Sequence, residues 1–122
     1  MRRIAVWIGW LAVALGLAAS AAAAASHDGN WSVLVITEKG ECDRAYRYEV
    51  TVADGRVNFA GQPGISVAGT VAANGAVKVS IIGGGSQSAH GIGRLATDNG
   101  TGTWHGAGRT GACTGRWEAS RR

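Results

Sequence analysis

Ala112-Cys113-Thr114-Gly115-Arg116-Trp117-Glu118-Ala119 is the stretch from which we infer the fold of this chain. Its odd-numbered positions carry small or apolar side chains and one tryptophan, whereas Arg116 and Glu118 fall on the opposite face, as in a strand with one solvated side. We expect this last strand to pair with a first strand over residues 29–36. The pairing would close a small antiparallel β-barrel.

Residues 1–25 have the layout of a cleaved secretory signal peptide. Arg2 and Arg3 place positive charge at the amino terminus, and residues 4–19 are almost free of polar side chains. The alanines of 21–25 offer small-residue cleavage sites. The pattern therefore predicts an N-terminal signal helix that is removed on export.

A membrane anchor is the alternative interpretation of this segment. The apolar run over 4–19 has 16 residues, which is shorter than the roughly 20 residues that a spanning helix needs. We therefore expect cleavage after Ala25. The expected mature protein is a single domain over 26–122, periplasmic or secreted, with no membrane association after cleavage.

The mature chain would carry little net charge. Removing Arg2 and Arg3 from the 12 Lys and Arg leaves 10 against 8 Asp and Glu, so the formal net charge falls from +4 to +2. The remaining basic residues are spread along the chain, whereas nucleic-acid binding needs them gathered in a patch. We expect no nucleic-acid partner.

Cys42 and Cys113 are the only cysteines. An even number of cysteines in an exported chain favours a disulfide. A redox-active pair usually has its thiols a couple of residues apart near a helix start, whereas these two lie 71 apart. A structural disulfide between Cys42 and Cys113 is therefore predicted.

The mature sequence repeats one pattern, a short alternating or β-branched run followed by a glycine-containing turn. No segment has apolar residues at helical spacing. The pattern predicts an all-β fold, an up-and-down meander of about eight strands that closes into a barrel and so removes its unpaired edges. An open meander or a two-sheet sandwich is the alternative.

Three hairpins can be assigned a register. Asp54-Gly55 supplies a tight turn that sets Val52 opposite Val57. A three-residue turn over 73–75 keeps one face apolar by setting Val71 opposite Val77. A turn at Asn99-Gly100 is expected to set Trp104 opposite Leu95.

Three tryptophans remain in the mature chain, Trp31, Trp104 and Trp117. We expect them in the barrel core, and they are also the candidate contacts to a ligand or a protein partner. The interior of an eight-stranded barrel can be nearly filled by its own side chains. Any ligand cavity is therefore expected to be small.

The mature histidines are His27, His90 and His105. In the expected hairpin His90 and His105 share a face, diagonal to one another with Arg94 between them. A cation there works against a metal site, and no third ligand lies at a useful spacing. No metal or other cofactor is predicted.

A catalytic triad could be assembled from Ser86 or Ser88, His90 and Asp98. Nothing in the sequence marks a nucleophile on a strained turn or an oxyanion hole. Polar residues in a glycine-rich loop account for these serines. We therefore predict no catalytic residues and no enzymatic activity.

Gly29-Asn30-Trp31 resembles the Gly-x-Trp that opens lipocalins, avidins and some small bacterial protease inhibitors. Arg116 is similar to the late arginine that packs on that tryptophan in lipocalins. The resemblance implies a barrel in which Arg116 covers Trp31.

A more extensive resemblance covers nearly the whole mature chain. The chain is similar to a group of uncharacterised small exported bacterial β proteins with a single disulfide. This resemblance implies no activity. The stretches that carry it are Asp28-Gly29-Asn30-Trp31-Ser32-Val33, Cys42-Asp43-Arg44-Ala45-Tyr46-Arg47-Tyr48, Gly102-Thr103-Trp104 and Cys113-Thr114-Gly115-Arg116-Trp117-Glu118-Ala119.

Together these observations predict an exported, non-enzymatic β-barrel that binds a small ligand or an exported protein. The alternative is an inhibitor of an exported protease, which would act through an exposed terminus or loop such as 27–30 or 83–88. The position of the aromatic side chains separates these functions, because an inward cluster around a void favours a ligand.

Overall fold

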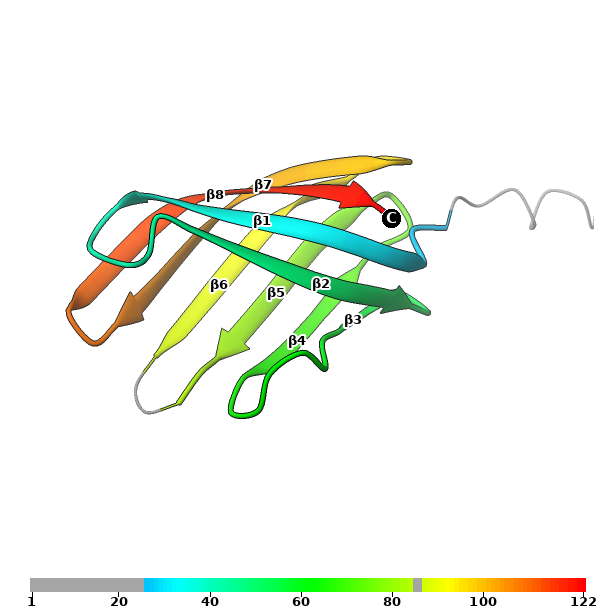
Figure 1. The fold of residues 1–122 in the computed structure, drawn as a ribbon. Helices are drawn as coiled ribbons and strands as arrows, with labels where there is room; N and C mark the ends of the chain where they lie inside the picture. The colour runs from blue at the N-terminus through cyan, green and yellow to red at the C-terminus, as the bar shows by residue number, and fades with distance from the viewer. Residues whose placement is uncertain (1–25, 85–86) are drawn as a thin grey trace, which may run out of the picture.

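The computed structural model describes residues 26–84 and 87–122, which form one antiparallel β-barrel (Figure 1). Each strand pairs with the next along the chain, and the last pairs with the first. The predicted closed up-and-down barrel is confirmed, and the predicted signal helix lies outside the described residues. The strands are β1 (Gly29–Lys39), β2 (Ala45–Ala53), β3 (Arg56–Asn58), β4 (Ser66–Val71), β5 (Ala76–Ile82), β6 (Ser88–Leu95), β7 (Asn99–Gly108) and β8 (Gly111–Arg121).

Alternation along the strands divides the barrel wall into a lumen face and an outer face. On β1, Val35 is opposite Trp117 of β8 and opposite Tyr46 of β2, so the aromatic faces of both neighbours turn inward. The predicted pairs in the first two hairpins are confirmed. They are Val52 with Val57 and Val71 with Val77.

The register predicted for the β6–β7 hairpin is wrong. Trp104 is opposite Gly91, and Leu95 is opposite Gly100. Neither Asn99 nor Gly100 has a positive φ, so this dipeptide begins β7 and does not form the turn. The chain reverses over 96–98.

Leu95 explains why the glycine at position 100 lies in a strand. A Cβ atom at Gly100 would clash with the Leu95 side chain, which occupies the space above it. Leu95 is buried in the core. The glycine therefore serves close packing across the hairpin.

One end of the barrel is plugged by the hydrophobic core and the other end is open. Both ends of the described chain lie at the plugged end, together with the β2–β3, β4–β5 and β6–β7 turns (Figure 1). The opposite end carries the β1–β2, β3–β4, β5–β6 and β7–β8 connections. The buried core consists of Trp31, Val52, Val71, Val77, Leu95, Trp117 and Ala119.

The short strand β3 interrupts the wall toward the open end. It pairs with β2 at three positions and with β4 at two. In the described chain, residues 45–50 of β2 have no strand partner on the edge that faces β3. Figure 1 shows β2 and β4 diverging from the plugged end toward the open end.

Within residues 26–84 and 87–122, there is no helix with the length and apolar character needed to cross a membrane.

Candidate functional site: the barrel lumen

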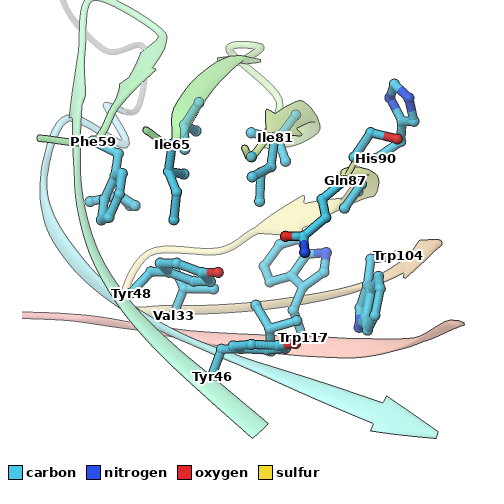
Figure 2. Close-up of a pocket in the computed structure, with 18 of the residues that line it drawn as sticks. Val33, Tyr46, Tyr48, Phe59, Ile65, Ile81, Gln87, His90, Trp104 and Trp117 are labelled. Carbon is cyan, nitrogen blue, oxygen red and sulfur yellow. The ribbon is translucent and has the colours of Figure 1, made fainter. Parts of the chain in front are cut away.

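The barrel contains a cavity of about 890 Å³ that opens at the end away from the termini (Figure 2). The expectation of a small cavity is therefore wrong. Its floor is the core around Trp31 and its mouth is formed by the connections that carry Asp43, Gln62, Gln87 and Arg109. The wall between floor and mouth is predominantly aliphatic and aromatic.

Glycines at lumen positions let large side chains lie flat against the wall, which leaves the centre of the barrel open. By register these glycines face inward at alternate positions on three neighbouring strands, where other small barrels carry bulky side chains. The glycines are visible in the sequence, but a glycine in a strand pattern equally indicates a bulge or a turn. The inward-facing glycines are Gly91, Gly93, Gly100, Gly102, Gly106 and Gly115.

Trp117 lies across two of these glycines. A Cβ atom at Gly102 would lie 2.5 Å from Trp117 Cε2, and a Cβ at Gly93 would also meet the ring. The indole Nε1 donates a hydrogen bond of 3.1 Å to the carbonyl of Ile92. The ring therefore lies across β7 and is held against the wall by its bond to β6.

Trp104 of β7 is held in the same way, because its ring lies across β8 and bonds to β1. A Cβ atom at Gly115 would lie 2.8 Å from Trp104 Nε1, which donates a hydrogen bond of 3.0 Å to the carbonyl of Ile36. Trp104 is half-buried, so part of its ring remains open to the cavity. Of the three candidate tryptophans, Trp104 and Trp117 line the wall.

Trp31 forms the floor. It is 1% exposed, and its Nε1 donates a hydrogen bond of 2.9 Å to the carbonyl of His27. Arg121 covers this ring, with its guanidinium carbon 4.7 Å from the ring centre. The role that the lipocalin resemblance assigned to Arg116 is therefore taken by Arg121, because Arg116 faces outward and pairs with Glu38.

An aromatic cluster from β2 and the β3–β4 connection lines the lumen near the gap beside β3. Tyr46 and Tyr48 stack with ring centres 6.2 Å apart and planes inclined by 19°. Phe59 meets Tyr48 edge-on, with ring centres 5.4 Å apart. Burial, with a smaller contribution from Tyr46, raises the pKa of Tyr48 above its ordinary value of 10.0.

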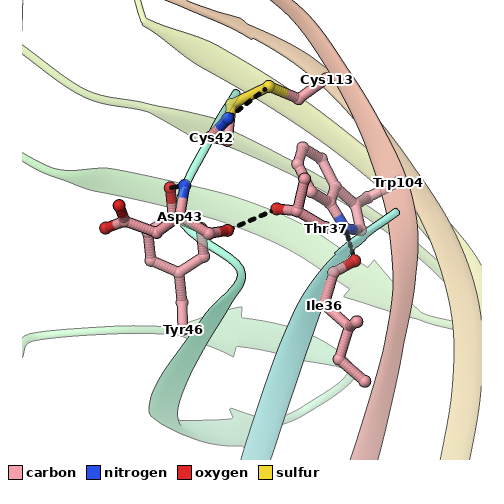
Figure 3. The surroundings of a disulfide bond; sticks show 7 residues. All are labelled: Ile36, Thr37, Cys42, Asp43, Tyr46, Trp104 and Cys113. Atoms are coloured by element: carbon pink, nitrogen blue, oxygen red, sulfur yellow. Dashed lines mark hydrogen bonds between the residues drawn. A yellow bond between two sulfur atoms is a disulfide. The ribbon is translucent and has the colours of Figure 1, made fainter. Parts of the chain in front are cut away.

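The predicted disulfide between Cys42 and Cys113 is confirmed and lies at the mouth (Figure 3). It joins the β1–β2 connection to β8, with the two Cα atoms 6.2 Å apart. Thr37 holds the same connection by donating a hydrogen bond of 2.6 Å from Oγ1 to the carbonyl of Asp43. A structural disulfide is typical of proteins in oxidising compartments outside the cytoplasm.

Of the histidines, His90 borders the cavity, although it begins from the outer face of β6. His90 and His105 are directly opposite on the outer face, with ring centres 5.5 Å apart, and the predicted diagonal arrangement around Arg94 is wrong because the register differs. Arg94 instead donates to the carbonyl of Asn74. Among the described residues, no group of three or more His, Cys, Asp and Glu side chains is arranged to hold a metal ion.

The residues considered for a catalytic triad are separated in the barrel. Ser88 begins β6 at the open end, whereas Asp98 lies in the β6–β7 turn at the plugged end, 3.7 Å from Arg121 Nε. His90 Nδ1 lies 3.1 Å from the Oγ of Ser80 on β5. Ser86 lies outside the described residues.

Comparisons of the chain with protein-family models, curated proteins and solved structures found no match. The lumen is therefore interpreted from its geometry and chemistry.

Proposed function

We propose that this is an exported, non-enzymatic carrier that holds a small, mainly apolar molecule in its lumen. The observation that supports the proposal is the cavity of about 890 Å³, plugged at one end and open at the other. Pockets for small molecules typically have volumes of roughly 300–1,000 Å³ and predominantly apolar linings. The periplasm or the extracellular medium is the proposed location.

The chemistry of the wall supports an apolar ligand. The lumen faces of β4 and β5 are aliphatic, with Val67, Val79 and Ile81 among the lining residues. The indole N–H groups of Trp104 and Trp117 are already bonded to backbone carbonyls. A ligand would therefore gain mainly from removing apolar surface from water, at roughly 25 cal/mol per Å².

The geometry gives less support to protease inhibition through residues 27–30. The Asp28 carboxylate accepts hydrogen bonds from the backbone N–H groups of Asp54 and Gly55. Arg121 donates to the Asp28 carbonyl. This segment is therefore held against the plugged end and is not free to enter a protease active site.

Native mass spectrometry of the mature protein, purified gently from its producing cells, tests the proposal. We expect an added mass that is lost on denaturation. The purified protein should also bind the neutral fluorescent probe N-phenylnaphthylamine. A protein that carries no added mass and binds no probe would overturn the proposal.

A matched pair of variants tests whether N-phenylnaphthylamine binds inside the lumen. Val79 faces the lumen between Gly69 and Gly91, so Val79→Trp places a large ring in the cavity. The adjacent Lys78 faces outward, and Lys78→Trp adds the same ring to the outer face. We expect Val79→Trp to weaken probe binding and Lys78→Trp to leave it unchanged.

A further inference from the structure

Charged side chains line the cavity only at its mouth. Glu41, Asp43 and Arg109 belong to the β1–β2 and β7–β8 connections, and the wall beneath them carries none. Moving an unpaired charge from water into an apolar interior is strongly unfavourable. The part of a ligand that enters the lumen should therefore be uncharged.

Several polar side chains of the lining belong to the connections at the open end, namely Gln62, Gln87 and Thr110, and Figure 2 shows the Gln87 amide directed into the cavity. The hydroxyls of Tyr46 and Tyr48 are the polar groups of the aromatic cluster on the wall. Trp31, Trp104 and Trp117 each donate their indole N–H to a backbone carbonyl. The Tyr46 hydroxyl accepts a hydrogen bond of 3.2 Å from the backbone N–H of Asp43, which holds it at the mouth although its own O–H can still donate. The Tyr48 hydroxyl has no such bond to the mouth.

The Tyr48 hydroxyl is directed into the cavity (Figure 2). Among the residues that the structure describes, it has no hydrogen-bond partner. The ordinary pKa of a tyrosine hydroxyl is about 10, so this group is protonated at physiological pH and can donate. A half-buried donor is stabilised by an acceptor, and the bond typically contributes about 1 kcal/mol.

Aromatic side chains surround this hydroxyl. Tyr46 and Phe59 contact the Tyr48 ring from two sides, and Trp104 and Trp117 line the wall formed by β7 and β8. The lumen glycines leave the tryptophan rings without large neighbours on those strands. Ring systems are stabilised by aromatic contacts beyond the area that they bury.

We infer that the lumen selects an uncharged, planar ring system with an oxygen acceptor, of the ketone or quinone kind, that accepts a hydrogen bond from the Tyr48 hydroxyl. This inference rests on the proposed function and specifies its ligand class. Straight alkyl chains and ring carboxylates are the classes that the lumen should disfavour.

Fluorene and fluorenone test the inference, because they share a planar skeleton and differ in the carbonyl. Their dissociation constants would be measured by equilibrium dialysis with the mature, disulfide-bonded protein. We expect fluorenone to bind about 5-fold more tightly than fluorene, as one hydrogen bond implies. Fluorenone carboxylate and hexadecanol should both bind more weakly than fluorenone.

Two variants test whether the preference for fluorenone over fluorene depends on the Tyr48 hydroxyl. Tyr48→Phe should bring the two dissociation constants together by weakening fluorenone and leaving fluorene unchanged. Tyr46→Phe, with the same loss of one hydroxyl, should retain the preference. Thermal unfolding of each variant checks that the barrel is intact.

The outcomes separate the inference from the proposed function. Equal binding of fluorene and fluorenone, or a preference that survives in Tyr48→Phe, would overturn the ligand class while the lumen remains a binding site. Tighter binding of hexadecanol than of fluorenone would overturn the ring requirement. Failure of both ring compounds and of N-phenylnaphthylamine to bind would overturn the function itself.

Discussion

Arg121 lies over the ring of Trp31, with 4.7 Å between the guanidinium carbon and the ring centre. The same guanidinium donates hydrogen bonds of 2.9 Å and 2.8 Å to the carbonyls of Thr97 and Asp28. One side chain of the last strand therefore connects the first strand, the residues before it and the β6–β7 turn. These contacts close the floor of the lumen.

Replacing Arg121 should destabilise the plugged end. We expect Arg121→Ala to lower the free energy of unfolding by about 2 kcal/mol, because it removes a cation–π contact and charge-assisted hydrogen bonds. Urea denaturation measures the change. Arg116→Ala is the control, since its partners Glu38 and Glu118 are about half exposed and such pairs contribute roughly 0–1 kcal/mol. Equal losses in the two variants would show that the floor contact has no special role.

The disulfide should contribute strongly to stability because it closes a long loop. Cys42 and Cys113 are separated by 71 residues, which corresponds to about 4 kcal/mol on the loop-entropy model. We expect the double variant Cys42→Ser, Cys113→Ser to have a markedly lower melting temperature in thermal unfolding. An unchanged melting temperature would contradict the view that this bond stabilises the pairing of β1 with β8, which closes the barrel.

The fold could be predicted because several strands carry unambiguous local patterns. The alternation along β2 and the Asp54-Gly55 turn agree with one register, and Asp54 and Gly55 both have the positive φ that the turn needs. At the next hairpin, keeping Val71 and Val77 on one face selected the correct turn length. Here local and tertiary preferences coincide.

The cavity and the β6–β7 register could not be predicted because a glycine has two structural uses. Asn74-Gly75 and Asn99-Gly100 are the same dipeptide, yet Gly75 has φ +93° in a turn whereas Gly100 lies in a strand beneath Leu95. Only the packed barrel shows which use applies. For the same reason, the sequence does not show which glycines face the lumen and let the tryptophan rings lie against its wall.

Lumen glycines beneath the tryptophans should not tolerate a side chain. A Cβ atom at Gly102 would meet the Trp117 ring and the carbonyl of Ile92, so we expect Gly102→Ala to lower the free energy of unfolding by about 1–3 kcal/mol. Trp117 fluorescence should change as its ring moves. The measurement is urea denaturation followed by fluorescence.

Gly91→Ala provides the matched control on the neighbouring strand. A Cβ atom at Gly91 has its nearest contact at 3.4 Å, with Val79, and its next at 3.6 Å. Gly91→Ala should therefore lower the free energy of unfolding only slightly. Replacing a strand glycine by alanine can also stabilise the strand by roughly 0.5–1 kcal/mol, which offsets part of this loss. If Gly91→Ala destabilises as much as Gly102→Ala, the contact with Trp117 is not what requires glycine.

Tyr48 should make stability depend on pH in the alkaline range. Its pKa in the folded protein lies above 10.0, so between the unfolded and folded values the folded state binds more protons. The contribution is therefore fully present below about pH 10 and is lost as the pH rises through the folded pKa. Ultraviolet titration of the phenolate should show a component above pH 10 that disappears in Tyr48→Phe and persists in Tyr46→Phe. Unfolding measured across the same range should lose less stability in Tyr48→Phe than in the wild type; an equal loss would place the alkaline sensitivity elsewhere in the barrel.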